Sequence, residues 1–291
     1  MTAPTAGLRQ DGAPDVPPLV SAEWLDEHRD DVVLLEVDEE SSRYYEGHIS
    51  GAYPVDWLDD LHHPVQRSFV DAEAFGRLMS RVGVGNECHV VLYGDAANYF
   101  AASAYWLFRY YGHQRVSLLD GGRRWWLLQG RELTEEPSTR RARPPYVVGA
   151  GNPHFRATRD EILSRYVGAP PGTAVLDCRS TEEYDGKVVE MVDLPVERHR
   201  VAGHIPGAVH LSTSQLVDQA TGRLLPTEEL RRLYADRGVR PGIDVVVYCR
   251  VAERSSLLWF ALHEVLHHPQ VRNYDGGWAE YGSLMDVPIE R

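Results

Sequence analysis

Short apolar runs alternate along this chain with stretches of helical period. Runs without a polar interruption predict strands buried on both faces of a sheet. Helix-like stretches open on Ser or Thr, as in VSAEWL (20–25) and ATRDEIL (157–163), where the hydroxyl can cap a helix. The alternation predicts an α/β fold in which each parallel sheet is flanked by helices on both faces. The clearest strand candidates are LLEVD (34–38), HVVLYG (89–94), VLDCR (175–179) and DVVVYC (244–249).

This pattern occurs twice. GHISGA (47–52) matches GHIPGA (203–208), and LLEVD matches VLDCR. From Tyr93 to Asp120 is 27 positions, as it is from Tyr248 to Asp275, and both aspartates begin Asp-Gly-Gly. Agreement at several ordered points indicates a duplicated domain.

The domain boundaries follow from composition. Residues 1–17 are rich in Pro, Ala and Gly without the apolar core of a signal peptide, and predict a flexible tail. Residues 136–154 are dense in Pro, Gly and charge, which predicts a linker. The two domains are then residues 18–135 and 155–291.

Composition narrows the partners. Lys+Arg 30 against Asp+Glu 43 leaves a net charge of −13, which argues against nucleic acid or an anionic membrane as the main partner. No apolar run approaches the roughly 18 residues that span a bilayer. Three widely spaced cysteines, Cys88, Cys178 and Cys249, fit neither a disulfide framework nor a zinc ribbon. A reducing cytoplasm is the expected compartment.

The segment Cys249–Arg254 follows a predicted strand and precedes an apolar helical pattern opened by serines. In parallel sheets, ligands bind beyond the carboxyl ends of the strands. Inward backbone N–H groups, the helix dipole, Arg250 and Arg254 would all favour a reactive thiolate there. The alternative is a cysteine buried for packing. A shift of 155 positions puts Gly94 opposite Cys249 and Asp95 opposite Arg250, so the first copy lacks this chemistry.

From about residue 18 to its end, the chain resembles the tandem-domain rhodaneses, a family of thiosulfate and mercaptopyruvate sulfurtransferases. The motifs that carry the resemblance are Asp177–Arg179, Gly203–Ala208, the six-residue loop Cys249–Arg254 and Asp275–Trp278. The resemblance implies two rhodanese-like domains, the first without the catalytic cysteine.

By this resemblance, Cys249 takes the outer sulfur of a small anionic donor, becomes a persulfide and passes the sulfur to cyanide or a thiol. No metal or organic cofactor is implied. The residues implied to bind the donor are Arg179, Arg250 and Arg254, and those implied to surround the persulfide are Val251, Ala252, Glu253 and Ser255.

The loop C-R-V-A-E-R departs from the family's C-R-K-G-V-T and C-G-S/T-G-V-T. Arg250 favours thiosulfate as donor. Ala252 replaces a glycine, and we expect it to be tolerated only if its φ is negative. The alternatives are a 3-mercaptopyruvate sulfurtransferase and a non-catalytic sulfur-carrier or regulatory module.

Several residues have a structural alternative. Arg179 could instead form an ion pair with Asp177. Because side chains alternate along a strand, the side chain of Cys178 should point to the opposite face of the sheet from those of Asp177 and Arg179. We therefore expect Cys178 to be a core thiol. About 15 additional residues at 186–200, relative to the first copy, form either a lid or a surface insertion.

Two rival chemistries are disfavoured. A phosphatase loop of the form C-x5-R needs one more residue than the four between Cys249 and Arg254. HEVLH (263–267) matches a zinc-protease motif but ends just before Pro269 without an evident third ligand. His48 and His204 occur in both copies, so we expect them to pack the turns.

Overall fold

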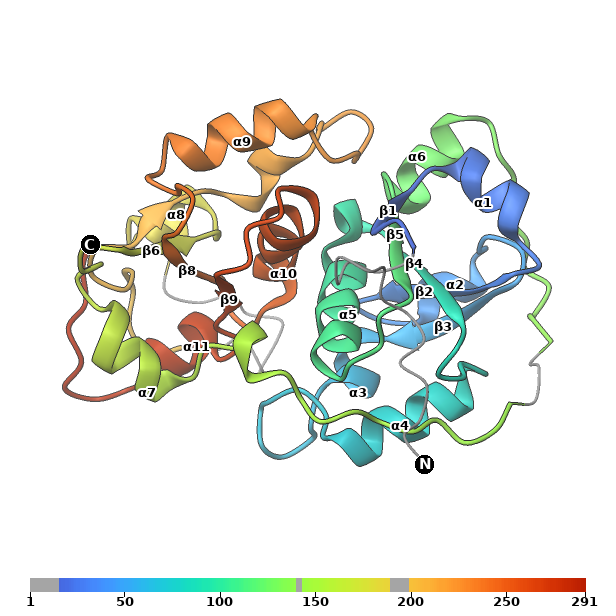
Figure 1. Ribbon diagram of the computed structural model, residues 1–291, viewed down its shortest axis with the longest axis horizontal. Coiled ribbons are helices and arrows are strands. Elements are labelled where there is room, and N and C mark those ends of the chain that lie inside the picture. The colour runs from blue at the N-terminus through green and yellow to red at the C-terminus, as the bar shows by residue number, and fades with distance from the viewer. Residues whose placement is uncertain (1–15, 140–142, 189–198) are drawn as a thin grey trace. The chain divides into compact units, whose positions relative to one another are not determined.

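The structure, a computed structural model, describes residues 16–139, 143–188 and 199–291 (Figure 1). The chain divides into two compact units. One contains the residues up to Asn152 with Ala220–Arg223, and the other contains Pro153–Gln219 with Leu224–Arg291. The division at Asn152 lies inside the expected linker. Most of the predicted tail and most of the 186–200 insertion lie outside the described residues.

The first unit is built on a parallel sheet with the strand order β1-β5-β4-β2-β3. Its strands are β1 (Leu19–Val20), β2 (Val32–Asp38), β3 (Ala52–Asp56), β4 (His89–Tyr93) and β5 (Val116–Leu119). Its helices are α1 (Ala22–His28), α2 (Ser42–Tyr45), α3 (Trp57–Leu61), α4 (Ala72–Arg81), α5 (Tyr99–Tyr110) and α6 (Gly122–Leu128), with a 3₁₀ turn at Ala96–Asn98.

The second unit repeats this order as β7-β6-β8-β9, also parallel. Its strands are β6 (Thr173–Asp177), β7 (Val209–His210), β8 (Asp244–Tyr248) and β9 (Val271–Asn273). Its α-helices are α7 (Arg159–Glu161), α8 (Thr181–Tyr184), α9 (Thr227–Ala235), α10 (Glu253–Phe260) and α11 (Gly277–Tyr281). Short 3₁₀ or π-helical segments are Pro153–Phe155, Ile162–Tyr166, Thr213–Leu216 and Ala261–Val265.

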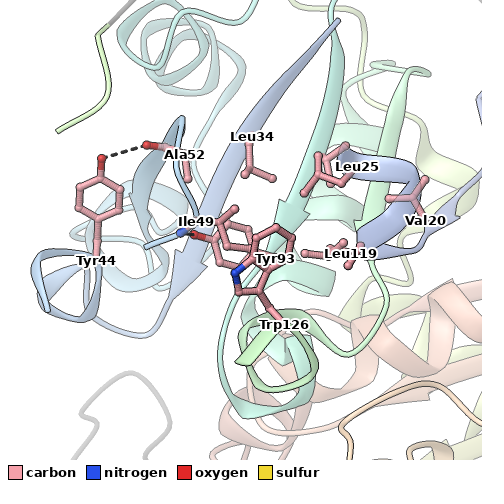
Figure 2. Close-up of a cluster of buried hydrophobic side chains, with 11 residues drawn as sticks. Val20, Leu25, Leu34, Tyr44, Ile49, Ala52, Tyr93, Leu119 and Trp126 are labelled. Atoms are coloured by element: carbon pink, nitrogen blue, oxygen red, sulfur yellow. Dashed lines mark hydrogen bonds between the residues drawn. The ribbon is translucent and has the colours of Figure 1, made fainter. Parts of the chain in front are cut away.

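Both faces of each sheet are covered, which confirms the predicted α/β class. In the first unit, Leu34 and Tyr93 pack with Leu25 of α1 and Trp126 of α6 on one face (Figure 2). Helix α5 contacts β2, β4 and β5. In the second unit, Val246 and Tyr248 pack with side chains of α11, and α10 contacts β8 and β9. Successive residues of a strand face opposite sides, so such continuous apolar strands supply both cores.

The predicted helix starts are correct. Ser21 caps α1 by accepting a hydrogen bond from the Trp24 amide. Thr158 and Glu161 form a reciprocal capping box at α7. These contacts satisfy backbone donors that the first helical turn leaves unpaired. Within the described residues, we find no helix with the length and apolar character needed to cross a bilayer.

Candidate active site

Cys249 lies where β8 ends, beside Cys178 at the end of β6. The strands pair Asp177 with Tyr248, so the two cysteines occupy the next register position. The Cys178 amide donates to the Tyr248 carbonyl at 3.0 Å. Side chains at paired positions share a face of a sheet. Both cysteines are buried, Cys249 completely, and the predicted core position of Cys178 is confirmed.

The thiols of these cysteines also interact electrostatically. Burial is the main cause that raises the pKa of the Cys178 thiol. A hydrogen bond with Cys249 and the negative charge of the Cys249 thiolate raise this pKa further. Cys178 therefore stays protonated beside Cys249 at neutral pH.

The loop that follows Cys249 is shorter than its sequence indicates. Helix α10 begins at Glu253, two residues before the serines, so Glu253 and Arg254 lie in its first turn. Ala252 precedes the helix with φ +78°. The expectation of a negative φ at Ala252 is therefore wrong, because the chain must turn sharply there to enter α10.

The loop's carbonyl groups face α11. The oxygens of Cys249 and Arg250 accept hydrogen bonds from the amides of Trp278 and Ala279, at 2.8 and 3.1 Å. In a planar trans peptide, the N–H points opposite to the C=O. The amides of Arg250 and Val251 consequently point away from α11. Gly277 makes this approach possible, since a β carbon there would lie 2.2 Å from the Arg250 oxygen.

Two side chains of α10 reach the Cys249 sulfur. The thiol donates a hydrogen bond to Glu253 Oε2, with Sγ and Oε2 3.2 Å apart. Ser255 Oγ lies 3.6 Å from Sγ and 2.7 Å from Asn273 Oδ1. The sequence placed Glu253 and Ser255 in the loop but did not indicate that the carboxylate faces the sulfur.

Arg250 and Arg254 converge on Glu183 of α8, which sequence analysis missed. Arg250 Nε donates to Glu183 Oε1 at 2.6 Å, and Arg254 Nη1 donates to Oε2 at 2.9 Å. Burial by itself raises the pKa of Glu183, but the two guanidiniums outweigh it and hold that pKa well below its usual range. Arg250 and Glu183 are buried, so this ion pair is shielded from solvent.

A signal for Glu183 exists in the repeat. Glu183 precedes Tyr184, as Arg43 precedes Tyr44. The two tyrosines are equivalent, because the hydroxyl of Tyr44 donates to the Ala52 carbonyl and that of Tyr184 to the carbonyl of its counterpart, Ala208. In the first unit, Arg43 pairs with Asp95, the counterpart of Arg250, at 3.3 Å. The two copies therefore hold the same ion pair with the charges exchanged, which a residue-by-residue alignment of the repeat would have shown.

Arg179 has the contacts of its structural alternative. Its guanidinium forms a buried ion pair with Asp177 at 2.5 Å and donates to the Gly203 carbonyl at 2.7 Å. The Trp278 ring lies 4.6 Å from its central carbon. The side chain is 1% exposed. These contacts occupy the guanidinium and favour the structural role. Donor binding by Arg179, which the family resemblance implies, stays a prediction.

The first unit keeps this arrangement by another route. Arg123 of α6 binds Glu36, the counterpart of Asp177, and the carbonyl of Gly47, the counterpart of Gly203. Arg123 stands at the repeat position of Trp278. A unit without a catalytic cysteine therefore retains the acid, the arginine and the turn carbonyl, which favours a structural role for them.

The two repeated histidines pack the turns, as predicted. His48 stacks on Tyr44 with 3.6 Å between ring centroids, and His204 stacks on Tyr184 at 3.8 Å. Each Nδ1 also contacts the carbonyl of that tyrosine, at 3.0 and 2.8 Å.

The HEVLH segment lacks the geometry of a zinc-protease helix. Ala261–Val265 is π-helical, and His267 follows it with φ +55°. His263 stacks on Trp259 and contacts Glu264. Across the described ranges, no group of three or more His, Cys, Asp or Glu is arranged to hold a metal ion.

Comparison with known proteins identifies related sequences over nearly the whole chain. The rhodanese-like domain matches residues 21–129 and 160–284. A Mycobacterium bovis protein named "Putative thiosulfate sulfurtransferase 1" is 45% identical over 94% of this chain and 97% of its own length. The Thermus thermophilus "Sulfur carrier protein TtuD" is also 45% identical, over 94% of this chain and 96% of its own length.

Solved structures share the fold. Wild-type EanB superposes with a TM-score of 0.82 at 23% identity, covering 97% of this chain and 72% of EanB. An EanB variant described as a persulfide intermediate with ergothioneine gives 0.83 at 22% identity, covering 97% of this chain and 73% of the variant. At this identity the likeness concerns the fold alone. The two matched domains and the relatives that span nearly the whole chain show that this protein belongs to the rhodanese family.

Proposed function

We propose that this protein is a sulfurtransferase that moves sulfane sulfur from thiosulfate to cyanide or a thiol through a Cys249 persulfide. The observation that carries the proposal is the position of Cys249 at the carboxyl end of β8, with Arg250 next to it in the loop and Arg254 in the first turn of α10. The relative named a thiosulfate sulfurtransferase supports it. The cytoplasm remains our prediction for the compartment, because the thiol must stay reduced.

In the proposed cycle, Cys249 Sγ attacks the outer sulfur of thiosulfate. The Sγ–S bond forms as the sulfur–sulfite bond breaks, and sulfite leaves with the electron pair. The outer sulfur stays on Cys249 as a persulfide anion. Attack by cyanide or a thiolate on this outer sulfur returns the electron pair to Sγ, in a ping-pong cycle. We assign the amides of Arg250 and Val251, which point away from α11, to stabilise the persulfide.

Donor choice rests on the charges around the loop. Arg250 and Arg254 offer two positive charges, and Glu183 and Glu253 balance them. A doubly charged donor must therefore draw the arginines from their carboxylates. 3-Mercaptopyruvate, with a single carboxylate, is the alternative donor.

A second candidate is a sulfur carrier with slow turnover. The pairing of Arg250 and Arg254 with Glu183 favours it, as does the Thermus relative named a sulfur carrier. Such a protein would accept sulfur on Cys249 and release it only to a specific partner.

The test is thiocyanate production from cyanide, with thiosulfate and 3-mercaptopyruvate as parallel donors. We expect thiosulfate to give the higher kcat/KM and Cys249→Ser to abolish turnover while keeping the fold. A Cys178→Ser variant that still gains one sulfur atom by mass is the matched control. Persulfide formation without turnover would favour the carrier, and substantial turnover by Cys249→Ser would refute the role of Cys249.

A further inference from the structure

Glu253 is a buried carboxylate that touches the sulfur of Cys249. The residue is 5% exposed and opens α10. Its Oε2 accepts the thiol hydrogen of Cys249, with 3.2 Å between the heavy atoms. Burying a carboxylate costs free energy unless charged or polar partners compensate. This side chain therefore needs an explanation beyond packing.

The other carboxylate oxygen has a cationic partner. Glu253 Oε1 accepts a hydrogen bond from Arg254 Nε at 3.0 Å. Arg254 in turn binds Glu183, and charge from Glu253, Glu183 and Cys249 raises its pKa far above the usual value although burial lowers it. The carboxylate thus lies between a thiol that can give up a proton and a guanidinium that cannot.

The first unit shows the same position without acid–base chemistry. Asn98 is the repeat counterpart of Glu253, and its Oδ1 accepts a hydrogen bond at 3.0 Å from the amide of Gly94, the counterpart of Cys249. An amide therefore suffices to hold the loop. The cysteine-bearing copy has a group of similar shape that can also bind a proton.

A thiol must lose its proton before its sulfur attacks. A fixed carboxylate beside the resulting thiolate would oppose it electrostatically. Transfer of that proton to the carboxylate removes this repulsion and leaves an O–H beside the sulfur. The contact between Cys249 and Glu253 has the hydrogen-bond geometry that such a transfer needs.

We propose that Glu253 is the proton acceptor for Cys249 and returns the proton when the persulfide is discharged. This proposal rests on the proposed function. The S–H bond of Cys249 breaks and an O–H bond forms on Glu253, before Sγ attacks the donor and sulfite leaves. Protonated Glu253 then donates a hydrogen bond to the persulfide. When the acceptor removes the outer sulfur, Sγ regains the electron pair and the proton of Glu253.

The test compares the full chain with Glu253→Gln across pH. Glutamine keeps the shape of glutamate and carries the amide group found at Asn98, but it cannot take the proton. The readout is the single-turnover rate of persulfide formation with thiosulfate. We expect a loss of about 10²-fold near neutral pH, the usual contribution of a general base, and recovery as the pH rises. Recovery is expected because hydroxide then removes the thiol proton.

The pH series reports on Glu253 and Cys249 only if the other charged groups near the site keep their charge over the pH range used. Arg254, Arg250 and Glu183 face the carboxylate or its partner, and Cys178 lies beside Cys249. The arginines stay cationic and Glu183 stays anionic near neutral pH. Glu228→Gln, on an exposed residue of α9, is the matched control. Glu253→Asp should retain part of the neutral-pH rate even if the glutamine variant folds poorly.

Alkylation of Cys249 by iodoacetamide separates this proposal from the proposed function, since it needs no sulfur donor. We expect the alkylation rate of Glu253→Gln to fall more steeply with decreasing pH than that of the wild type. If the wild type forms no persulfide, the proposed function fails while alkylation still tests Glu253. Identical pH profiles, or faster reaction of the glutamine variant at neutral pH, would overturn the role of Glu253.

Discussion

Ala252 is a point where a single residue strains the loop that carries Cys249. Its φ of +78° lies in the left-handed region, where a β carbon crowds the following carbonyl at a cost of roughly 1–2 kcal/mol. Neighbouring contacts over-determine the loop, since α11 amides bind the carbonyls of Cys249 and Arg250. Strain of this kind often accompanies functional sites.

Replacing Ala252 by glycine should stabilise the protein. Glycine removes the β-carbon strain but gives back part of the gain through unfolded-state entropy, so we expect a net increase of about 0.5–1 kcal/mol in the free energy of unfolding. Urea unfolding of the full chain measures it.

Ala235→Gly is the control for Ala252→Gly. Ala235 is the exposed last residue of α9, where glycine should cost no more than the roughly 0.5–1 kcal/mol typical of a helix interior. A similar loss of stability in both variants would mean that Ala252 carries no strain.

At the scale of elements, the two units keep corresponding ion pairs but take the partners from different places. Helices α8 and α2 supply Glu183 and Arg43 to the loops after β8 and β4, with opposite signs. The strand end of β6 supplies Arg179, whereas α6 supplies Arg123. The buried pairs, Arg250–Glu183, Arg179–Asp177 and Arg123–Glu36, each remain matched in charge, because an unpaired buried charge is costly.

The ion pair of Arg179 makes a prediction about its role. Lysine keeps the charge but loses the planar fork that binds Asp177 and the Gly203 carbonyl. We expect Arg179→Lys to lower the free energy of unfolding by about 1–3 kcal/mol and to leave the KM for thiosulfate unchanged. Urea unfolding and steady-state kinetics check the two expectations.

Arg165→Lys is the control for this experiment, because Arg165 is largely exposed and pairs with Asp244 at 3.1 Å. It should change neither quantity appreciably. A large rise in KM for Arg179→Lys without loss of stability would instead assign Arg179 to the donor.

At the scale of the whole molecule, duplication left two similar units with different chemistry. The second has the thiol and its ion pairs, and the first has a buried acidic cluster. Burial raises the pKa of Glu36 to about 7, although Tyr93 and Arg123 act in the opposite direction. The pKa of Asp38 is raised as well, first by burial.

These shifts predict a pH dependence of stability in the first unit. The pKa of Glu36 is higher in the folded chain than its ordinary 4.5, so the folded state holds the proton more tightly. The contribution to stability is fully present below about pH 4.5 and is lost as the pH rises through about 7. We expect Glu36→Gln to lose less stability than the wild type over this range, as measured by urea unfolding of the full chain.

The comparison with Glu36→Gln is needed because other groups change the stability in the opposite direction as the pH rises. Burial lowers the pKa of His113 to about 4, so its contribution grows as the pH rises from about 4 to 6.5. The difference between wild type and variant cancels this term. A difference that does not change with pH would contradict the assignment to Glu36.

The repeat, the α/β class, the strands and the position of Cys249 after a strand were all predictable from the amino-acid sequence alone. These follow from periodicities of two and 3.6 residues and from motif spacing, which are local properties of a chain. The packing role of His48 and His204 was also predictable, because it recurs in both copies. The charge exchange between Arg43 and Glu183 was present in the sequence as well, but only a full alignment of the repeat exposes it.

The directions of the charged side chains became apparent only in the folded structure. Glu253 faces the Cys249 sulfur because α10 begins at Glu253 itself, and the left-handed turn at Ala252 determines that start. Glu183 reaches Arg250 because α8 ends near the loop, although 67 positions separate the two residues. Packing and the free-energy cost of burying a charge determine which partners a long, flexible side chain contacts. Neither can be read from the local spacing of residues.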